Sequence, residues 1–203
     1  MLSDSAAVET NAVTDEDRLR ADVYRLLARF LTQPPTQADL AFAKSLEGGE
    51  TAIGQAVRTF ARIAGATEVS EADDEYHALF IGVGRGELLP YASYYLTGFL
   101  HEKPLARLRN DMAALGITAN PDATEPEDHA AAVLDIMAGL IDGSFGEALT
   151  LAKQKEFYDA HVGCWMPLFF RDLEGASSSV LYAALAQIGT QFLDIESAAF
   201  EMD

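Results

Sequence analysis

Apolar residues recur every three or four positions through most of the chain, which is the spacing of one face of an α-helix. The first such run follows Thr14 and Asp17, whose types and separation are those of an N-terminal capping box, and it stops before Pro34. A second capping pair, Thr36 and Asp39, precedes the next run. The two pairs therefore predict the starts of two consecutive helices.

Six further helices follow from the same kind of pattern. They are expected over residues 53–64, from a Ser70 cap to about Phe80, from near Pro104 to Gly116, from a Thr124/Glu127 capping box to Gly143, from Ser144 to about His161, and after Ser177. Residues 82–98 and 117–124 are read as loops, and residues 164–175 as a tight aromatic connection.

No alternating strand pattern and no repeat of 20 to 50 residues interrupts these helices. We therefore predict an all-α, single-domain helical bundle of about eight or nine helices over residues 15–200, preceded by a flexible tail over residues 1–14. A chain of 203 residues is long enough to bury a proper core.

Charge narrows the range of partners. The chain carries 14 Lys and Arg against 32 Asp and Glu, a formal net charge of −18, which repels nucleic acid and anionic lipid surfaces. The acidity either attracts cationic partners or only keeps the protein soluble. No apolar run reaches the roughly 20 residues of a membrane span. Without an export signal, and with Cys164 as its one cysteine, the chain is expected in the cytoplasm.

The sequence offers little support for catalysis or for a bound cofactor. The four histidines lack a metal-binding spacing, and the His161/Cys164 pair has no second ligand pair nearby. Cys164 lies among apolar neighbours and is expected to be a buried, inert thiol. The glycine-rich segment GVGRGE, residues 82–87, lacks the lysine and hydroxyl of a phosphate-binding loop. We predict no metal and no cofactor.

Two segments stand out from the helical pattern. The stretch ELLPYASYYLTG, residues 87–98, concentrates apolar and aromatic residues where glycine and proline break helices, which suits either a core loop or a docking surface. The segment EPEDH, residues 125–129, is expected in the first turn of a capped helix. Its carboxylates either serve that cap or bind a guanidinium group, and His129 is a group whose charge could change near neutral pH.

These two segments resemble the paired signatures of the TorD/DmsD family of redox-enzyme maturation chaperones. EYHALFIGVGRGELLPYASYYL matches the first signature and EPEDH the second, in the same order and about 30 residues apart. The resemblance implies an all-helical, non-catalytic protein that binds the twin-arginine signal peptide and the apo-form of a molybdenum- or tungsten-cofactor oxidoreductase. It would hold that client, for example a formate-dehydrogenase-like enzyme, until cofactor insertion is complete.

The resemblance also implies the residues of the binding site. Positions carried over from the family signatures are Tyr76, Leu79, Phe80, Pro90, Tyr91, Ser93, Asp128 and His129, with Tyr91 standing where several relatives have tryptophan. A basic, moderately apolar leader needs acidic groups beside an apolar groove. We expect Glu125, Glu127 and Asp128 to meet its arginines, and Leu79, Phe80, Leu88, Leu89, Pro90 and Tyr91 to meet its apolar part.

Three other functions remain open from the sequence. The chain could be an assembly chaperone for a nitrate reductase whose client has no exported leader. It could be a nucleotide hydrolase that uses Glu127 or His129 as a base, with the 82–86 loop near phosphate. It could also be an acidic adaptor subunit. The chain is expected to be a monomer or a homodimer. Whether the Pro90 loop and the Asp128 turn adjoin in space does not follow from the sequence.

Overall fold

The computed structural model describes residues 12–118 and 123–202, and within them the chain folds into ten α-helices and one π-helix with no strand. The all-α prediction is confirmed, although the helices outnumber the eight or nine expected. In chain order they are α1 (Asp15–Thr32), α2 (Gln37–Lys44), α3 (Ala52–Ala64), α4 (Val69–Tyr76), η1 (His77–Ile81), α5 (Ala92–Thr97), α6 (Lys103–Ala114), α7 (Ala130–Asp142), α8 (Leu151–His161), α9 (Met166–Gly175) and α10 (Leu181–Met202).

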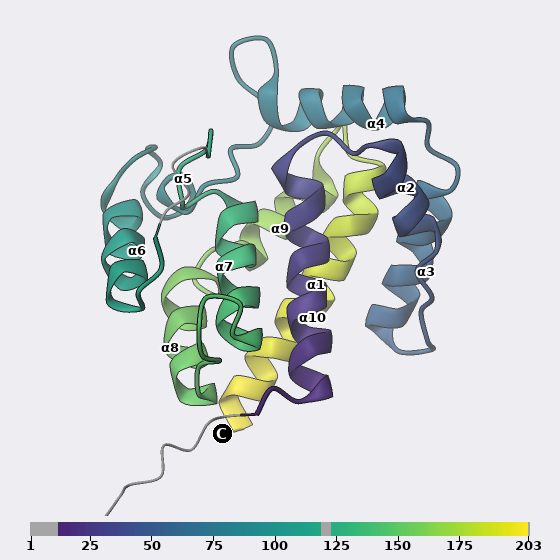
Figure 1. Cartoon of the computed structure of the whole chain (residues 1–203). Coiled ribbons are helices and arrows are strands. Elements are labelled where there is room, and N and C mark those ends of the chain that lie inside the picture. The colour runs from purple at the N-terminus through teal and green to yellow at the C-terminus, as the bar shows by residue number, and fades with distance from the viewer. Residues whose placement is uncertain (1–11, 119–122, 203) are drawn as a thin grey trace, which may run out of the picture.

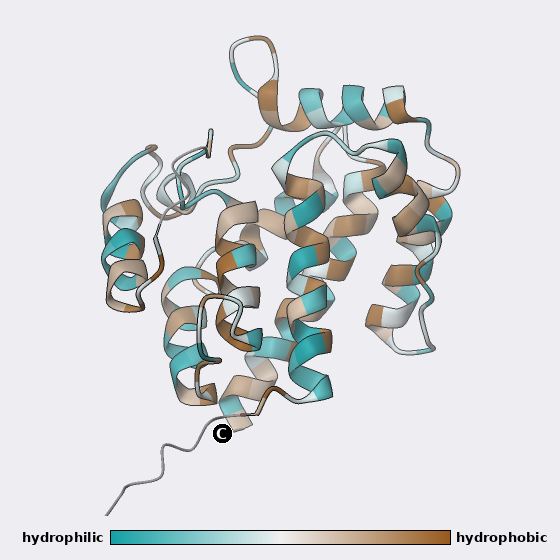
Figure 2. Ribbon diagram, viewed as in Figure 1, coloured by the Kyte–Doolittle hydropathy of each residue, from teal (hydrophilic) through white to brown (hydrophobic). Residues whose placement is uncertain are grey.

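Two long helices organise the bundle. α1 packs along α7, and α10 packs between α3 and α9, while α4 lies across one end of the bundle (Figure 1). α7 is apolar over most of its length and nearly every residue from Ala130 to Ile141 is buried. Apolar residues predominate along α7, whereas they alternate with polar ones along α1 and α6 (Figure 2). None of the helices in the described residues is both long and apolar enough to cross a membrane.

The early capping pairs form as predicted. The backbone N–H of Asp17 donates to Thr14 Oγ1 at 3.1 Å, and the N–H of Asp39 donates to Thr36 Oγ1 at 3.3 Å, with each aspartate accepting from its cap residue in return. Gly143 ends α7 with a left-handed φ of 77°, as its position suggested. The expected tail falls mostly on residues 1–11, which lie outside the described residues.

Three predicted helix starts were wrong. Glu68, not Ser70, caps α4, where Glu71 completes the capping box. α8 begins at Leu151, with Thr150 as its N-cap, whereas Ser144 bonds back to Asp142, with its N–H donating to Asp142 Oδ1 at 2.9 Å. The start of α7 was misplaced by several residues, for a reason that lies in the candidate site.

Two short helices were missed altogether. α5 lies inside the region read as a loop, and α9 lies in the aromatic stretch read as a connection. α9 buries Met166, Phe169 and Phe170. Cys164, just before it, is exposed rather than buried, so that prediction was wrong; its thiol donates to the carbonyl of Ala160.

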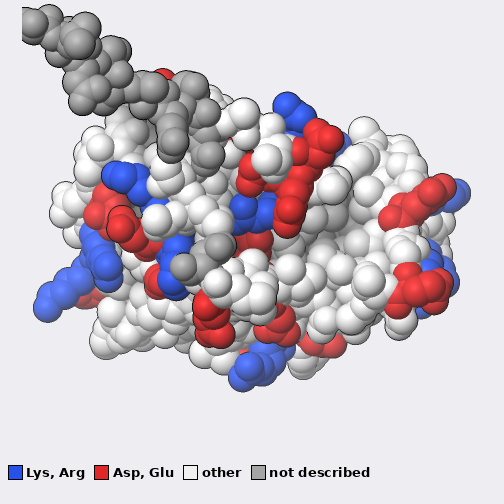
Figure 3. Space-filling model, turned by 90° about the horizontal axis from the view of Figure 1, so that it is seen from below, with Lys and Arg blue, Asp and Glu red and all other residues white. Residues whose placement is uncertain are grey.

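Charged groups on the surface are mixed in sign. At the end of the molecule where α1 begins and α10 ends, Lys and Arg side chains lie against Asp and Glu, with uncharged areas between them (Figure 3). Arg25, for example, pairs with Asp142 at 2.6 Å, and Arg18 pairs with Asp15 at 2.7 Å. The net charge of −18 is therefore not spread as a uniform negative coat over this face.

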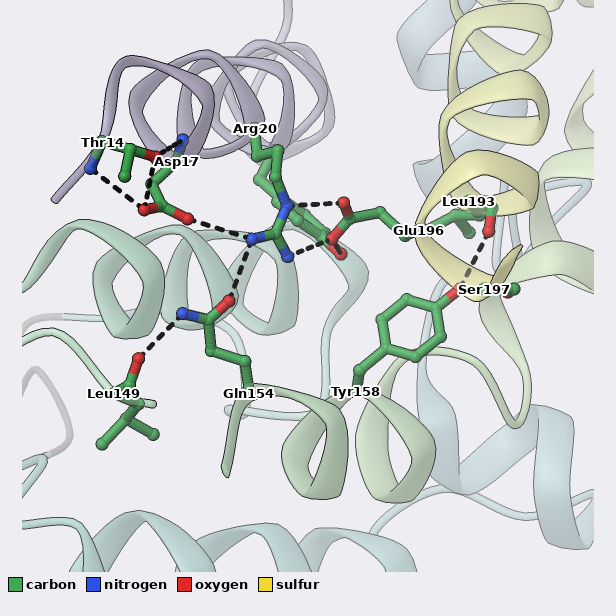
Figure 4. Close-up of polar contacts among 10 residues, drawn as sticks. Thr14, Asp17, Arg20, Leu149, Gln154, Tyr158, Leu193, Glu196 and Ser197 are labelled. Carbon is green, nitrogen blue, oxygen red and sulfur yellow. Dashed lines mark hydrogen bonds and ion pairs between the residues drawn. The ribbon is translucent and has the colours of Figure 1, made fainter. Parts of the chain in front are cut away.

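A buried polar network ties α1, α8 and α10 together (Figure 4). Arg20 donates twice to Glu196, from Nε at 2.7 Å and from Nη2 at 2.9 Å, and Tyr24 donates to the same carboxylate at 2.9 Å. Arg20 also donates to Gln154, whose amide donates to the carbonyl of Leu149. Because Glu196 is only 1% exposed, its charge is stable there only while these donors remain.

We predict that Glu196→Ala lowers the free energy of unfolding by about 3 kcal/mol, because the mostly buried Arg20 would lose its bidentate partner and keep only the longer pair with Asp17 at 3.2 Å. Urea denaturation followed by circular dichroism measures this. Asp15→Ala is the matched control, since it breaks the exposed pair with Arg18 and should cost less than about 1 kcal/mol. Equal losses for the two variants would contradict the assigned role of the network.

Candidate functional site

The two signature segments of the sequence meet directly in the structure. Tyr91 and His129 form an isolated antiparallel bridge, in which the N–H of Ala92 donates to the carbonyl of Asp128 at 2.9 Å and the N–H of Ala130 donates to the carbonyl of Pro90 at 2.8 Å. We call the paired residues 90–93 and 128–130 the junction. It settles that the Pro90 loop and the Asp128 turn adjoin.

The junction also explains where α7 begins. His129 has extended backbone angles, φ −64° and ψ 140°, because its neighbours are paired with the Pro90 segment. It therefore becomes the N-cap of α7, and its Nδ1 accepts from the N–H of Ala131 at 3.2 Å. EPEDH thus forms the turn before the helix, not its first turn, and the predicted Thr124/Glu127 capping box was wrong.

Asp128 is inside the protein, not on its surface. Its side chain is part of a residue only 1% exposed, and its Oδ2 accepts from the N–H of Ser93 at 2.9 Å and from the Ser93 hydroxyl. The other oxygen, Oδ1, is buried with no partner in the described structure. Asp128 and Ser93 therefore hold the start of α5 against the turn before α7, and the expected direct contact between Asp128 and a client arginine is not accessible in this conformation.

His129 is likewise buried, at 5% exposure, with its ring 5.1 Å from the Tyr91 ring. Burial lowers its pKa to about 4, an effect that the charges of Glu125 and Asp128 only partly offset. The sequence suggested a group whose charge changes near neutral pH, and that suggestion was wrong. His129 is a neutral cap residue under physiological conditions.

Glu125 is the exposed carboxylate of this region. It accepts a hydrogen bond from the hydroxyl of Tyr91 at 2.5 Å. Burial raises the pKa of Tyr91, and its hydrogen bond to Glu125 raises it further, so the phenol stays protonated and remains a donor. The ring of Tyr91 is half-buried and its hydroxyl lies at the surface, so Tyr91 holds the Glu125 carboxylate in place.

Glu127 is already engaged by a cation of this chain. Arg109 on α6 donates to its Oε2 from Nε at 2.9 Å and from Nη2 at 2.8 Å. Partial burial would raise the pKa of Glu127, but the hydrogen bonds from Arg109 outweigh it and the pKa is lowered. A client arginine would therefore have to displace Arg109 to reach Glu127.

The aromatic part of the first signature is mostly interior. Tyr76 and Leu79 are buried, and Phe80 is half-buried, with its ring 5.0 Å from Tyr76 and 5.4 Å from Tyr182 of α10. Burial raises the pKa of Tyr76 to about 12, with a smaller contribution from the charge of Glu125, and the Tyr76 hydroxyl donates to the carbonyl of Leu31 at 3.4 Å. These residues therefore belong to the core on which the junction packs, and not to an exposed binding surface.

The glycine-rich loop closes on the π-helix that precedes it. The N–H groups of Glu87 and Leu88 donate to the carbonyls of Ala78 and Leu79, at 3.2 and 2.8 Å. A Cβ on Gly86 would lie 2.4 Å from the backbone carbon of Phe80, so only glycine fits this close return. Leu88 and Leu89 are half-buried and Pro90 is buried, which makes this stretch a core loop more than an open apolar surface.

Two depressions flank the exposed segment Ala123–Glu125. One has a volume of about 440 Å³ and lies between α6, α7 and Phe145; the other has a volume of about 700 Å³ and lies between α1 and α7. Their shared lining residues are Ala123, Thr124, Glu125, Ala132 and Asp135. Two exposed carboxylates, those of Glu125 and Asp135, therefore border both depressions.

Sequence reasoning missed several residues of this surface. Asp135 is the one charged residue within the apolar run of α7 before Asp142, and that isolation was a signal that could have identified it. Ile117, Ile136 and Phe145 line the smaller depression and were also missed. The Phe145 ring covers Gly139, where a Cβ would lie 2.1 Å from a ring carbon. Only the fold brings these segments together.

The larger depression also holds cations, but each has a partner. Arg25 pairs with Asp142 at 2.6 Å, and Arg29 pairs with Asp39 and stacks on Phe42, with its guanidinium 5.0 Å from the ring centroid. No group of three or more His, Cys, Asp or Glu residues in the described parts of the chain is arranged to hold a metal ion. The arrangement is suited to binding a cationic chain, with Glu125 and Asp135 available to guanidinium groups.

Comparison with known proteins agrees with the architecture. A family model described as "Nitrate reductase delta subunit" matches residues 47–171. The chaperone protein TorD of Vibrio cholerae serotype O1, strain ATCC 39541, is 34% identical over 122 residues, which span 57% of this chain and 56% of that chaperone's length. The TorD chaperone of Vibrio atlanticus is 29% identical over 202 residues, covering 86% of this chain and 94% of the relative.

A solved structure shows the same fold. A protein of Archaeoglobus fulgidus assigned as a redox enzyme maturation protein superposes with a TM-score of 0.58 at 21% identity, over 87% of this chain and 94% of that one. Since the family model covers more than half of the sequence, the chain belongs to the TorD-type family that the nitrate reductase delta subunit model describes.

Proposed function

We propose that this protein is a cytoplasmic maturation chaperone that binds the twin-arginine leader of an apo-oxidoreductase and holds the client until its molybdenum or tungsten cofactor is inserted. The names of the TorD relatives and the maturation-protein fold support the chaperone role. The function needs a surface for a basic and apolar leader and requires no catalytic group.

One observation carries the proposal: Glu125 and Asp135 each border both depressions beside the junction. Two adjacent arginines present two guanidinium groups that cannot both pair with one carboxylate in the favoured bidentate geometry. Two separate carboxylates on a concave surface meet that need. In this proposal, Glu125 and Asp135 replace the buried Asp128 as the groups that contact the arginines.

The apolar part of the leader would lie in the smaller depression. Its lining includes Met112, Ile117, Ile136 and Phe145, and Phe145 is 46% exposed. Met112, Ile117 and Ile136 are already buried, so the leader would cover mainly Phe145, and burying its ring supplies free energy that ion pairs at the surface do not. Micromolar affinity needs only about −8 kcal/mol after the costs of ordering the peptide.

The buried signature residues act as positioning residues in this account. Ser93, Asp128 and His129 do not touch the leader; they fix the turn that carries Glu125. Pro90 supplies a carbonyl to the junction, and Tyr91 holds the Glu125 carboxylate directly. In this proposal, most residues of the family signature position the binding surface and do not themselves contact the leader.

A double variant tests the acidic contacts. We predict that Glu125→Gln with Asp135→Asn weakens binding of a synthetic leader, made of two adjacent arginines followed by an apolar stretch, by about tenfold or more. Isothermal titration calorimetry at two salt concentrations measures the affinity and its salt dependence. Glu16→Gln with Asp194→Asn is the matched control, because it removes the same charge from exposed positions outside the depressions.

An equal loss of affinity in the control would show that only net charge matters and would contradict the assigned site. A replacement of the two arginines by lysines in the peptide should reduce binding to the unmodified protein, since lysine cannot make the bidentate pair. If that change has no effect on affinity, the two carboxylates do not distinguish guanidinium groups from ammonium groups, which contradicts the proposed contact.

The neutral state of His129 gives the protein a defined pH response. Its folded-state pKa of about 4 lies below the ordinary value of 6.5, so the unfolded chain binds more protons between these pH values. The free energy of unfolding should therefore fall as pH falls from 6.5 to about 4, by about 3 kcal/mol from this group. His129→Asn keeps a cap acceptor and should remove that dependence, whereas His77→Asn, at an exposed position, should keep it.

Chemical denaturation at pH values between 4 and 7 measures this response. Parallel pH curves for the native protein and the His129→Asn variant would show that His129 is not a buried neutral group. Leader binding is best measured above pH 6.5, where His129 is neutral in both folded and unfolded chains.

A second candidate is a nitrate reductase assembly chaperone, which the description of the family model favours. The identity of the client separates the two candidates. A client co-purified from native cells would carry paired arginines at its N-terminus under the first and would lack them under the second.

A further inference from the structure

A second concave surface lies on the other side of α6. A cavity of about 290 Å³ is enclosed by α5, α6, α7 and α8, and a neighbouring one of about 350 Å³ continues between α6 and α8. The two share Arg107, Ala160 and His161 in their linings. Together they form an elongated furrow along the α6–α8 seam, which we call the seam furrow.

The first part of the seam furrow differs in charge from the leader site. Its lining contains Lys103 and Arg107 but no aspartate or glutamate, in a chain whose net charge is −18, whereas the second part is lined by Lys153 together with Asp111 and Glu156. Lys103 makes no ion pair within the described structure. Arg107 reaches only to 3.9 Å from Asp111, whose carboxylate is already bound by His161 Nε2 at 2.7 Å. Both cations are available to a carboxylate from outside.

Leu96 lines this cationic end, and two further exposed apolar residues follow it in the chain. Leu96, Phe99 and Leu100 are 44%, 70% and 40% exposed. They do not lie on a loose loop: Gly98 ends α5 in the left-handed conformation, with φ 81°, and the N–H of Phe99 donates to Thr97 Oγ1 at 3.2 Å. The backbone is thus held in a shape that presents large apolar side chains to solvent, which marks a binding surface.

We propose that the seam furrow binds an acidic amphipathic segment of a partner protein, distinct from the basic leader. The segment would occupy the first part of the furrow, because Asp111 and Glu156 in the second part would repel its carboxylates. The apolar side chains of the segment would cover Leu96, Phe99 and Leu100, and its carboxylates would meet Lys103 and Arg107.

The geometry of α6 keeps the two surfaces apart. Arg107 lines the seam furrow, whereas Arg109, two residues on, pairs with Glu127 beside the leader site. Residues two apart on a helix point in nearly opposite directions, so each arginine serves one side. The protein would grip a partner through a basic segment on one side of α6 and an acidic segment on the other.

The test uses the full chain and two fluorescent amphipathic helical peptides, one with leucines and glutamates and one with leucines and lysines. Lys103→Glu with Arg107→Glu should weaken binding of the acidic peptide at least tenfold in fluorescence anisotropy and leave binding of the basic peptide within about twofold. Lys44→Glu with Arg62→Glu is the matched control, with the same charge change at exposed positions on α2 and α3.

A Phe99→Ser variant tests the apolar contact separately, because it leaves the charge of the furrow unchanged. It should weaken the acidic peptide several-fold at high salt as well as at low salt, and circular dichroism should show an unchanged fold because Phe99 is largely exposed. The proposal is overturned if the control and the Lys103/Arg107 variant lose affinity equally. It is also overturned if sedimentation shows self-association that the Lys103/Arg107 variant abolishes, because a second copy would then be the occupant.

Discussion

The candidate site depends on one interaction, the pairing of the Pro90 segment with the turn before α7. Two backbone hydrogen bonds at 2.8 and 2.9 Å and the buried Asp128–Ser93 contact hold these segments together across 35 residues of sequence. Buried polar groups are costly unless bonded, so this arrangement is stable only as a complete set. Because it fixes the turn, it also fixes Glu125 at the surface.

From this junction follows a division between framework and surface. Tyr76, Leu79, Pro90, Ser93, Asp128 and His129 are buried and hold the framework, while Glu125 and Asp135 border the depressions. α6 then separates this acidic surface from the seam furrow on its other side, whose first part is lined by Lys103, Arg107 and Leu96. Two surfaces of opposite charge on one small bundle would allow a chaperone to recognise one client at two points, which adds avidity without a tight single site.

The sequence correctly predicted the structural features that depend on interactions between residues close together in the chain. The capping boxes at Thr14 and Thr36 formed because their partners lie three residues away. The helical spacing along α10 is matched by the burial of Leu181, Leu185, Ile188 and Phe192, although Ile195 is 50% exposed. The sequence could not place the start of α7, because His129 is held in an extended conformation by its bridge to Tyr91, which is distant in sequence.

The same limit applies to the site. The resemblance identified the signature residues and the region, and the turn at Glu125 lies there. It could not show that Asp128 points inward, since burial depends on the partner Ser93. Asp135 and Phe145 lie outside both signatures and join the surface only through the packing of α7 and the segment after it. The roles of all these residues in client binding stay predictions.

Hydrogen–deuterium exchange of the free and leader-bound protein tests the central claim most directly. The account predicts that the amides of Ala92, Ser93 and Ala130 exchange as slowly as the interior of α7 in both states, and that a bound leader slows exchange at Thr124 and Glu125. Fast exchange at the three junction amides in the free protein, or leader-induced protection confined to regions away from residues 123–135, would contradict it.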